Sequence, residues 1–167
     1  MKLIIKQKYF SLRDKFTITD ENGQPWFYVE GNIPFFSRKK IHIYDMNNNE
    51  VLFLQSRFTF LFMKFDFFRP ASGMDQPIGL FKEKMHFPFT RRFRYSDENG
   101  EIAISGSFIG FNWKFKDAAT KALVGTLNKK FFKIADTYTL DITDDTKDPA
   151  LMLAFALLID LRHHSGH

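Results

Sequence analysis

Hydrophobic and polar residues alternate with a period of two along most of the chain. In the segment 136–143, Tyr138 and Leu140 share one face, while polar side chains occupy the other. Successive side chains of a β-strand point to opposite faces, so each such segment predicts a strand with one buried face. The pattern predicts twelve strands, at residues 2–9, 14–20, 24–31, 39–45, 50–58, 60–68, 77–84, 91–97, 101–108, 111–117, 122–130 and 136–143.

Turn signals separate these segments, and one phrase occurs twice. A Lys-x-Lys strand followed by Asp-Glu-Asn-Gly spans residues 6–23 and returns at 82–100. Asn-Gly pairs tolerate the positive φ angles that tight hairpins need. The longest polar break, 69–77, lies between the two copies. We therefore predict a single domain over residues 1–167, built from two similar halves at about 1–75 and 76–147.

The C-terminal region departs from this alternation. Asp148 is a suitable N-cap and Pro149 suits the first helical position, while residues 150–159 are all apolar. A helix that is apolar all round is buried all round, and this run is shorter than the roughly 20 residues that span a membrane. The sequence thus predicts a mainly β fold: a 12-stranded antiparallel closed barrel around a central hydrophobic helix at about 148–162.

Composition excludes some chemistry. The chain has no Cys, which excludes disulfides, thiol catalysis and cysteine-based zinc sites. Its 22 Phe residues suit half-buried pleated surfaces. The N-terminus has no apolar core of the kind found in secretory signals, so we expect a cytoplasmic location. The formal charge of +5 favours anionic partners without defining a site.

No catalytic constellation is evident. The five His residues follow no metal-binding spacing, and the acidic group Asp141, Asp144 and Asp145 lacks the glycine and terminal glutamate of a calcium loop. Nucleophile elbows, P-loops and dinucleotide-binding glycines are also absent. We therefore expect no enzymatic activity, no metal and no cofactor.

Basic residues cluster near the predicted strand ends. If neighbouring outer faces bring them together, they form a positive patch for anionic lipid headgroups or a phosphorylated ligand, and nucleic acid is not excluded. Protection of strand edges and solubility are the competing explanation. The candidate residues are Lys6, Lys8, Lys39, Lys40, Lys82, Lys84, Arg91, Arg92, Arg94, Lys129 and Lys130.

The segment 57–68 is apolar on both faces of a strand. Phe58, Phe60 and Phe62 point one way, and Phe65 and Phe67 point the other. One interpretation is a surplus exposed surface that contacts a protein partner. The other is a turn near residues 60–62 that resets the alternation, with burial throughout.

Several segments resemble the LURP-one-related family, including its bacterial YxjI type. The resemblance rests on residues 6–23, on the segments 40–45 and 138–142 and on the closing apolar helix, and it covers essentially the whole chain. That family is similar to the Tubby C-terminal domain and to phospholipid scramblases. The resemblance implies the same 12-stranded barrel around a helix.

The resemblance implies less about function than about fold. Some Tubby-like domains bind phosphoinositides, but none of their phosphate-binding residues is assigned to a position in this chain. From the sequence we expect a non-enzymatic binding module that places a basic face on anionic membrane lipid. The alternative is an intracellular scaffold that uses an exposed Phe-rich surface.

Overall fold

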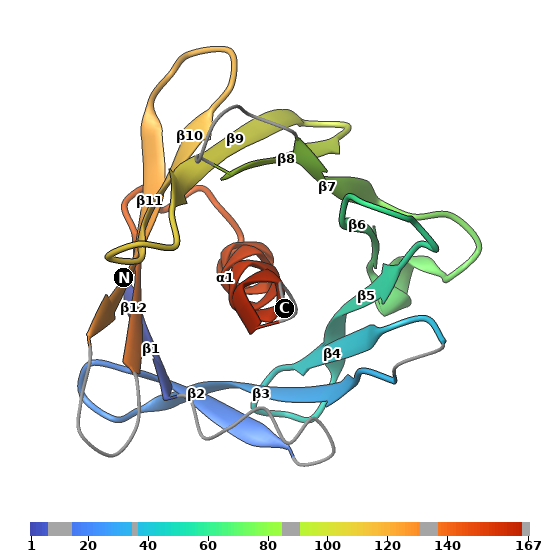
Figure 1. Ribbon diagram of the computed structural model, residues 1–167. Helices are drawn as coiled ribbons and strands as arrows, with labels where there is room; N and C mark the ends of the chain where they lie inside the picture. Colours follow the sequence, from blue (N-terminus) through green and yellow to red (C-terminus); the bar gives the residue numbers. More distant parts are fainter. Residues whose placement is uncertain (7–14, 35–36, 85–90, 131–136, 165–167) are drawn as a thin grey trace.

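Twelve strands surround one helix in the computed structural model (Figure 1). The structure describes residues 1–6, 15–34, 37–84, 91–130 and 137–164. The strands are β1 (Lys2–Lys6), β2 (Phe16–Asp20), β3 (Pro25–Asn32), β4 (Lys40–Tyr44), β5 (Glu50–Ser56), β6 (Lys64–Phe68), β7 (Gly79–Lys84), β8 (Arg91–Asp97), β9 (Gly100–Ser107), β10 (Asn112–Asp117), β11 (Leu123–Lys130) and β12 (Thr137–Ile142). A 3₁₀ turn, Pro70–Ser72, follows β6, and helix α1 spans Pro149–His164.

The sheet closes on itself. Each strand pairs with its neighbours in sequence, and β1 pairs with β12 to complete the ring. All of these pairs are antiparallel, so even-numbered strands begin, and odd-numbered strands end, at the same rim. We call this the C-rim, because the C-terminal end of α1 lies there. The opposite rim, where α1 begins, is the N-rim. The predicted fold class is confirmed.

Helix α1 fills the barrel. Its residues from Met152 to Leu161 are all buried, and the ring of Phe155 lies 5.1–6.1 Å, centroid to centroid, from four rings of the wall, within the range that aromatic pairs prefer. Gly125 on β11 permits this close packing, because a Cβ atom there would lie 2.6 Å from the Met152 side chain. The alternation predicted from sequence thus points one face of each strand at the helix.

Most predicted strands agree with the observed ones to within a few residues at each end, and the predicted strand residues 7–9, 14 and 136 lie outside the described residues. The largest departure is the segment 60–68, where β6 begins only at Lys64. Residues 57–63 instead form the β5–β6 loop at the C-rim. The turn predicted near residues 60–62 is therefore present. The burial predicted with it is wrong for Phe58, Phe60 and Leu61, which are 71%, 98% and 65% exposed.

Candidate functional site

Basic side chains converge on the outer wall of β6–β10. In one cross-strand row, Lys64 pairs with Lys82, Lys82 with Arg94, and Ala103 then separates Arg94 from Lys116. Side chains that are directly opposite on neighbouring antiparallel strands have Cβ atoms about 5 Å apart. This row therefore places three positive charges side by side.

A second row runs beside the first, nearer the C-rim. Lys84 pairs with Arg92, and Ser105 separates Arg92 from Lys114. All of these side chains point away from the core, since they alternate with buried residues of the same strands. We call the two rows together the basic field: Lys64, Lys82, Lys84, Arg92, Arg94, Lys114 and Lys116.

Among the described residues, acidic side chains border the outer face of the field on its N-rim side. The next row contains Asp66 and Glu101, with Leu80 and Ser96 between them. Arg94 donates to Glu101 at 2.7 Å, and this hydrogen bond lowers the pKa of the Glu101 carboxyl. Within the described part of the chain, no other member of the field forms an ion pair.

The structure distributes the predicted basic residues over several places. Lys82, Lys84, Arg92 and Arg94 lie in the basic field, and Lys8 lies outside the described residues. Lys6 and Lys130 both pair with Thr137 at the C-rim, on the outer wall of β1, β12 and β11. Lys40 lies on β4, and the remaining three, Lys39, Arg91 and Lys129, lie at the C-rim at positions with inward parity.

Sequence reasoning did not include Lys64, Lys114 and Lys116 among the candidates. Lys114 and Lys116 were recognisable as polar residues that alternate with Trp113 and Phe115. Their nearness to Lys82 and Arg92 depends on the order and register of five strands, which alternation alone does not give.

A buried carboxylate ties together the C-rim end of the barrel. Glu83 is 6% exposed and accepts hydrogen bonds from Arg91, from Arg162 at 2.9 Å and from the backbone N–H of Met63 at 3.1 Å. The backbone N–H of Glu83 in turn donates to the carbonyl of Met63. One side chain thus joins β7, β8, the end of α1 and the β5–β6 loop. Buried charges need such full pairing.

Asp160 is a second buried acid near this end of α1. The Tyr138 hydroxyl donates to Asp160, and His164 Nε2 lies 3.2 Å from the same carboxylate oxygen. Burial raises the pKa of Asp160, while its hydrogen bond from Tyr138 and the charges of His164 and Lys129 oppose that rise.

The acids of the N-rim have a different role, because they close turns. Asp20 accepts from the backbone N–H groups of Asn22 and Gln24, and Asp45 accepts likewise from Asn47 and Asn49, all at 2.9 Å. The same arrangement recurs at Asp97, Asp117 and Asp144. These are Asx turns, in which the side chain takes the place of a backbone carbonyl.

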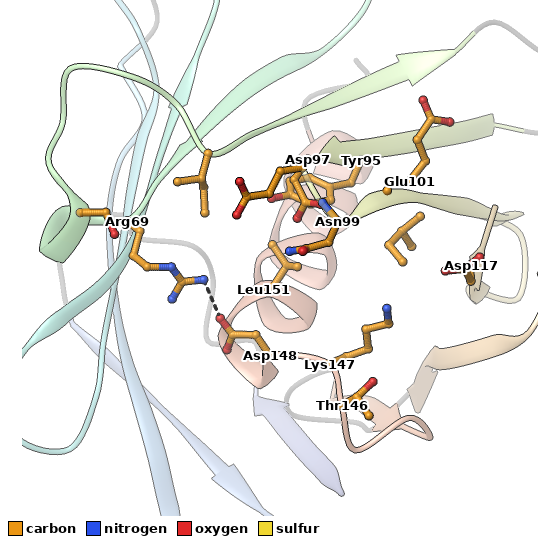
Figure 2. Close-up of a pocket in the computed structure, with 15 residues that line it drawn as sticks. Arg69, Tyr95, Asp97, Asn99, Glu101, Asp117, Thr146, Lys147, Asp148 and Leu151 are labelled. Atoms are coloured by element: carbon orange, nitrogen blue, oxygen red, sulfur yellow. Dashed lines mark hydrogen bonds and ion pairs between the residues drawn. The ribbon is translucent and has the colours of Figure 1, made fainter. Parts of the chain in front are cut away.

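A cavity of about 340 Å³ opens at the N-rim, between the start of α1, the β8–β9 turn and the segment after β6 (Figure 2). Five carboxylates line it, and four of them already have partners. Asp97 and Asp117 hold turns, Asp148 caps α1 and pairs with Arg69 at 3.1 Å, and Glu101 pairs with Arg94. Most of the acidity of this cavity therefore serves the fold.

Tyr95 lies beside the same cavity. Its hydroxyl is buried without a hydrogen-bond partner among the described residues. Burial raises the pKa of Tyr95, and the negative charge of the nearby Asp97 raises it further. The described lining offers no His and no paired nucleophile and base. Across the described residues, no group of three His, Asp or Glu side chains is arranged to hold a metal ion.

Comparison with known proteins gives the family. A family model described as LURP-one-related matches residues 1–160. A search of curated proteins found no match. Among solved structures, an X-ray structure of a protein from Arabidopsis thaliana is similar, with a TM-score of 0.61 and 17% identity over 95% of this chain and 90% of that one. At that identity the likeness shows the fold alone.

The barrel around a central helix is consistent with the relation to Tubby-like domains expected from the sequence. No helix among the described residues is long and apolar enough to cross a membrane. The matched region covers all twelve strands and most of α1. The chain therefore belongs to the LURP-one-related family.

Proposed function

We propose that the protein is a non-enzymatic binding module that places the outer wall of β6–β10 on an anionic membrane surface. The observation that carries the proposal is the register of five strands, which gathers the seven residues of the basic field. Each Lys or Arg near an anionic bilayer contributes about 1 kcal/mol of attraction.

Folding alone gives little reason for such a field. Like charges directly opposite one another on neighbouring strands are destabilising, yet Lys64, Lys82 and Arg94 are consecutive cross-strand partners. Lysines often protect exposed sheet edges, but a closed barrel has no edge to protect. Solubility would be served equally well by interspersed charges of both signs. Attraction to an anionic partner would account for these neighbouring like charges.

A membrane suits this wall better than nucleic acid does. Proteins that bind single strands place aromatic side chains between their basic residues, so that bases stack on them. Here the positions between the basic residues hold Ala103 and Ser105. The field is thus a cluster of charges on a sheet face without the stacking platforms of single-strand-binding proteins, which favours lipid headgroups as the partner.

Co-sedimentation with vesicles tests the proposal. We expect binding to phosphatidylcholine vesicles that contain phosphatidylserine, weaker binding at physiological than at low ionic strength, and no binding to phosphatidylcholine alone. Absence of binding to the anionic vesicles at low salt would overturn it. Tighter binding to an RNA or DNA oligonucleotide than to the vesicles would overturn it in favour of nucleic acid.

A double substitution assigns the binding to the field. Replacing Lys82 and Lys116 with Gln removes two charges without breaking a described ion pair. We expect a loss of about 2 kcal/mol, or roughly 30-fold in affinity for the anionic vesicles. The matched control, Lys2→Gln with Lys147→Gln, removes two charges at the N-rim and should bind as the unsubstituted protein does. Equal losses in the two variants would mean a net-charge effect and no defined surface.

A further inference from the structure

The β5–β6 loop presents apolar side chains to solvent at the C-rim edge of the basic field. Phe60 is 98% exposed, and Phe58 and Leu61 are 71% and 65% exposed. Ile109, in the β9–β10 turn at the same rim, is 88% exposed. The two segments flank the wall that carries the field, one before β6 and one before β10.

The loop is held in this conformation by its own contacts. The backbone N–H of Arg57 donates to the carbonyl of Lys64 at 2.9 Å and closes the loop. The Arg57 side chain forms a forked pair with Asp66, at 2.9 and 2.7 Å. Met63 exchanges hydrogen bonds with Glu83. A loop anchored at both ends in this way keeps its apolar tip outside the core.

The surroundings of the tip are positive. The Arg38 guanidinium lies 5.4 Å from the centroid of the Phe58 ring, and Lys64, the first residue of the basic field, directly follows the loop. At the C-rim, six of the twelve described strand ends are Lys or Arg and none is Asp or Glu: Lys6, Lys40, Lys64, Lys84, Arg91 and Lys130. Apolar tips within a positive rim are complementary to anionic headgroups above a hydrocarbon layer.

We infer that the β5–β6 loop is a membrane anchor, whose side chains of Phe58, Phe60 and Leu61 enter the headgroup region of an anionic bilayer, with Ile109 as a second point of contact. This inference rests on the proposed function and adds depth and orientation to it. The outer wall of β6–β10 faces the lipid with its C-rim end deepest, and the N-rim end of the same wall lies farther from the bilayer.

Affinity distinguishes insertion from charge attraction. Phe60→Ser should weaken binding to the phosphatidylserine vesicles about tenfold, because moving a Phe side chain from water into an apolar layer strengthens binding by about tenfold or more. The loss should persist at physiological ionic strength, since apolar contacts are not screened. The control Met46→Ser, at the exposed β4–β5 turn of the N-rim, should bind normally. Both variants should keep the thermal midpoint of the unsubstituted protein.

A fluorescent label reports depth directly. The chain has no Cys, so Phe60→Cys provides a single site for an environment-sensitive dye. With anionic vesicles the dye should shift to shorter wavelength and become protected from an aqueous quencher. The same dye at Asn47→Cys, on the N-rim, should show neither change.

The outcomes separate the two proposals. If the unsubstituted protein does not bind the vesicles, both proposals fail. If it binds, but Phe60→Ser binds equally well and the dye at position 60 stays exposed, only the anchor is overturned. A dye shift without vesicles that grows with protein concentration, together with a dimer in sedimentation equilibrium, would overturn the anchor and assign the loop to self-association.

Discussion

The two rims of the barrel carry opposite charges, and those charges have different uses. At the N-rim, Asp20, Asp45, Asp97 and Asp117 each accept backbone N–H groups of the turn that follows. At the C-rim, the basic strand ends Lys6, Lys40, Lys64, Lys84 and Lys130 make no described ion pair. Folding accounts for the acids and leaves these bases unexplained. This difference between the rims supports placing the proposed membrane contact at the C-rim.

The helix ends follow the same division. At the N-rim, Asp148 accepts from the backbone N–H of Ala150 at 2.9 Å, as an N-cap does. At the C-rim, the last turn of α1 carries Arg162, His163 and His164, which suit the negative end of a helix. Arg162 is fixed by the buried Glu83, whereas the Asp148 pair with Arg69 is more open to solvent. The two helix ends should therefore contribute unequally to stability.

The largest effect is expected at Glu83. Glu83→Ala removes the common acceptor of Arg91, Arg162 and the Met63 N–H. Breaking a buried charge pair typically costs 3–5 kcal/mol. Arg91 and Arg162 keep some contact with water, so their unpaired charges remain partly solvated. We therefore expect a loss of about 3 kcal/mol in the free energy of unfolding, measured by denaturant titration.

Glu83→Gln provides the control for this prediction. It keeps an acceptor of nearly the same shape and should recover part of the loss. A Glu83→Ala protein as stable as the unsubstituted one would show that the C-rim does not depend on this carboxylate.

A smaller effect is expected at the other helix end. Asp148→Ala removes the N-cap of α1 and its pair with Arg69, and we expect a cost of about 1 kcal/mol. Asp148→Asn retains the capping oxygen and should lose less. A cost at Asp148 that equals or exceeds the one at Glu83, in the same titration, would reverse the inequality between the two rims.

The smallest effect is a difference in the sign of pH dependence. The backbone N–H of Asn49, with the further hydrogen bonds of the turn, lowers the pKa of Asp45, whereas burial raises the pKa of Asp160. A lowered pKa adds stability above the ordinary value of 3.8, which is lost as the pH falls through the folded-state pKa. A raised pKa adds stability below 3.8, which is lost as the pH rises through the folded-state pKa.

Two substitutions to Asn read out this difference. The loss of stability that Asp45→Asn causes, measured against the unsubstituted protein, should be larger at neutral pH than at acid pH. Asp160→Asn should show the opposite trend, although His164 and Lys129, which face Asp160, reduce it. Unfolding midpoints measured across the acid range give both trends, and a common sign for the two variants would contradict the assignment.

The sequence predicted the strands and the helix well because these depend on local periodicity. Tyr138 and Leu140 face inwards by parity, and the all-apolar run after Pro149 required a buried helix. The β5–β6 loop was harder, because Phe favours strands and residues 58–62 offered no Gly, Pro or Asn to mark a turn.

The candidate site was predicted only in part, because it depends on contacts between distant segments. Lys82 and Arg94 shared the repeated phrase and were found. Lys64 lay within a segment predicted as strand from residue 60. Because the true strand begins only at Lys64, the predicted segment did not give the register that pairs Lys64 with Lys82. Glu83 has the inward parity of Phe81, but a charged residue seldom occupies a buried position, and its three donors come from segments far apart in sequence.

The position of Glu83 has a consequence for how the molecule responds to its surroundings. The exposed loop, β8 and the last turn of α1 all converge on this one carboxylate. A ligand that holds the loop in its native form therefore also favours the docked helix, since both belong to the same folded state. Binding of lipid at the loop and the stability of the folded barrel are thus linked. We therefore expect the protein to unfold at a higher temperature with bound lipid than without it.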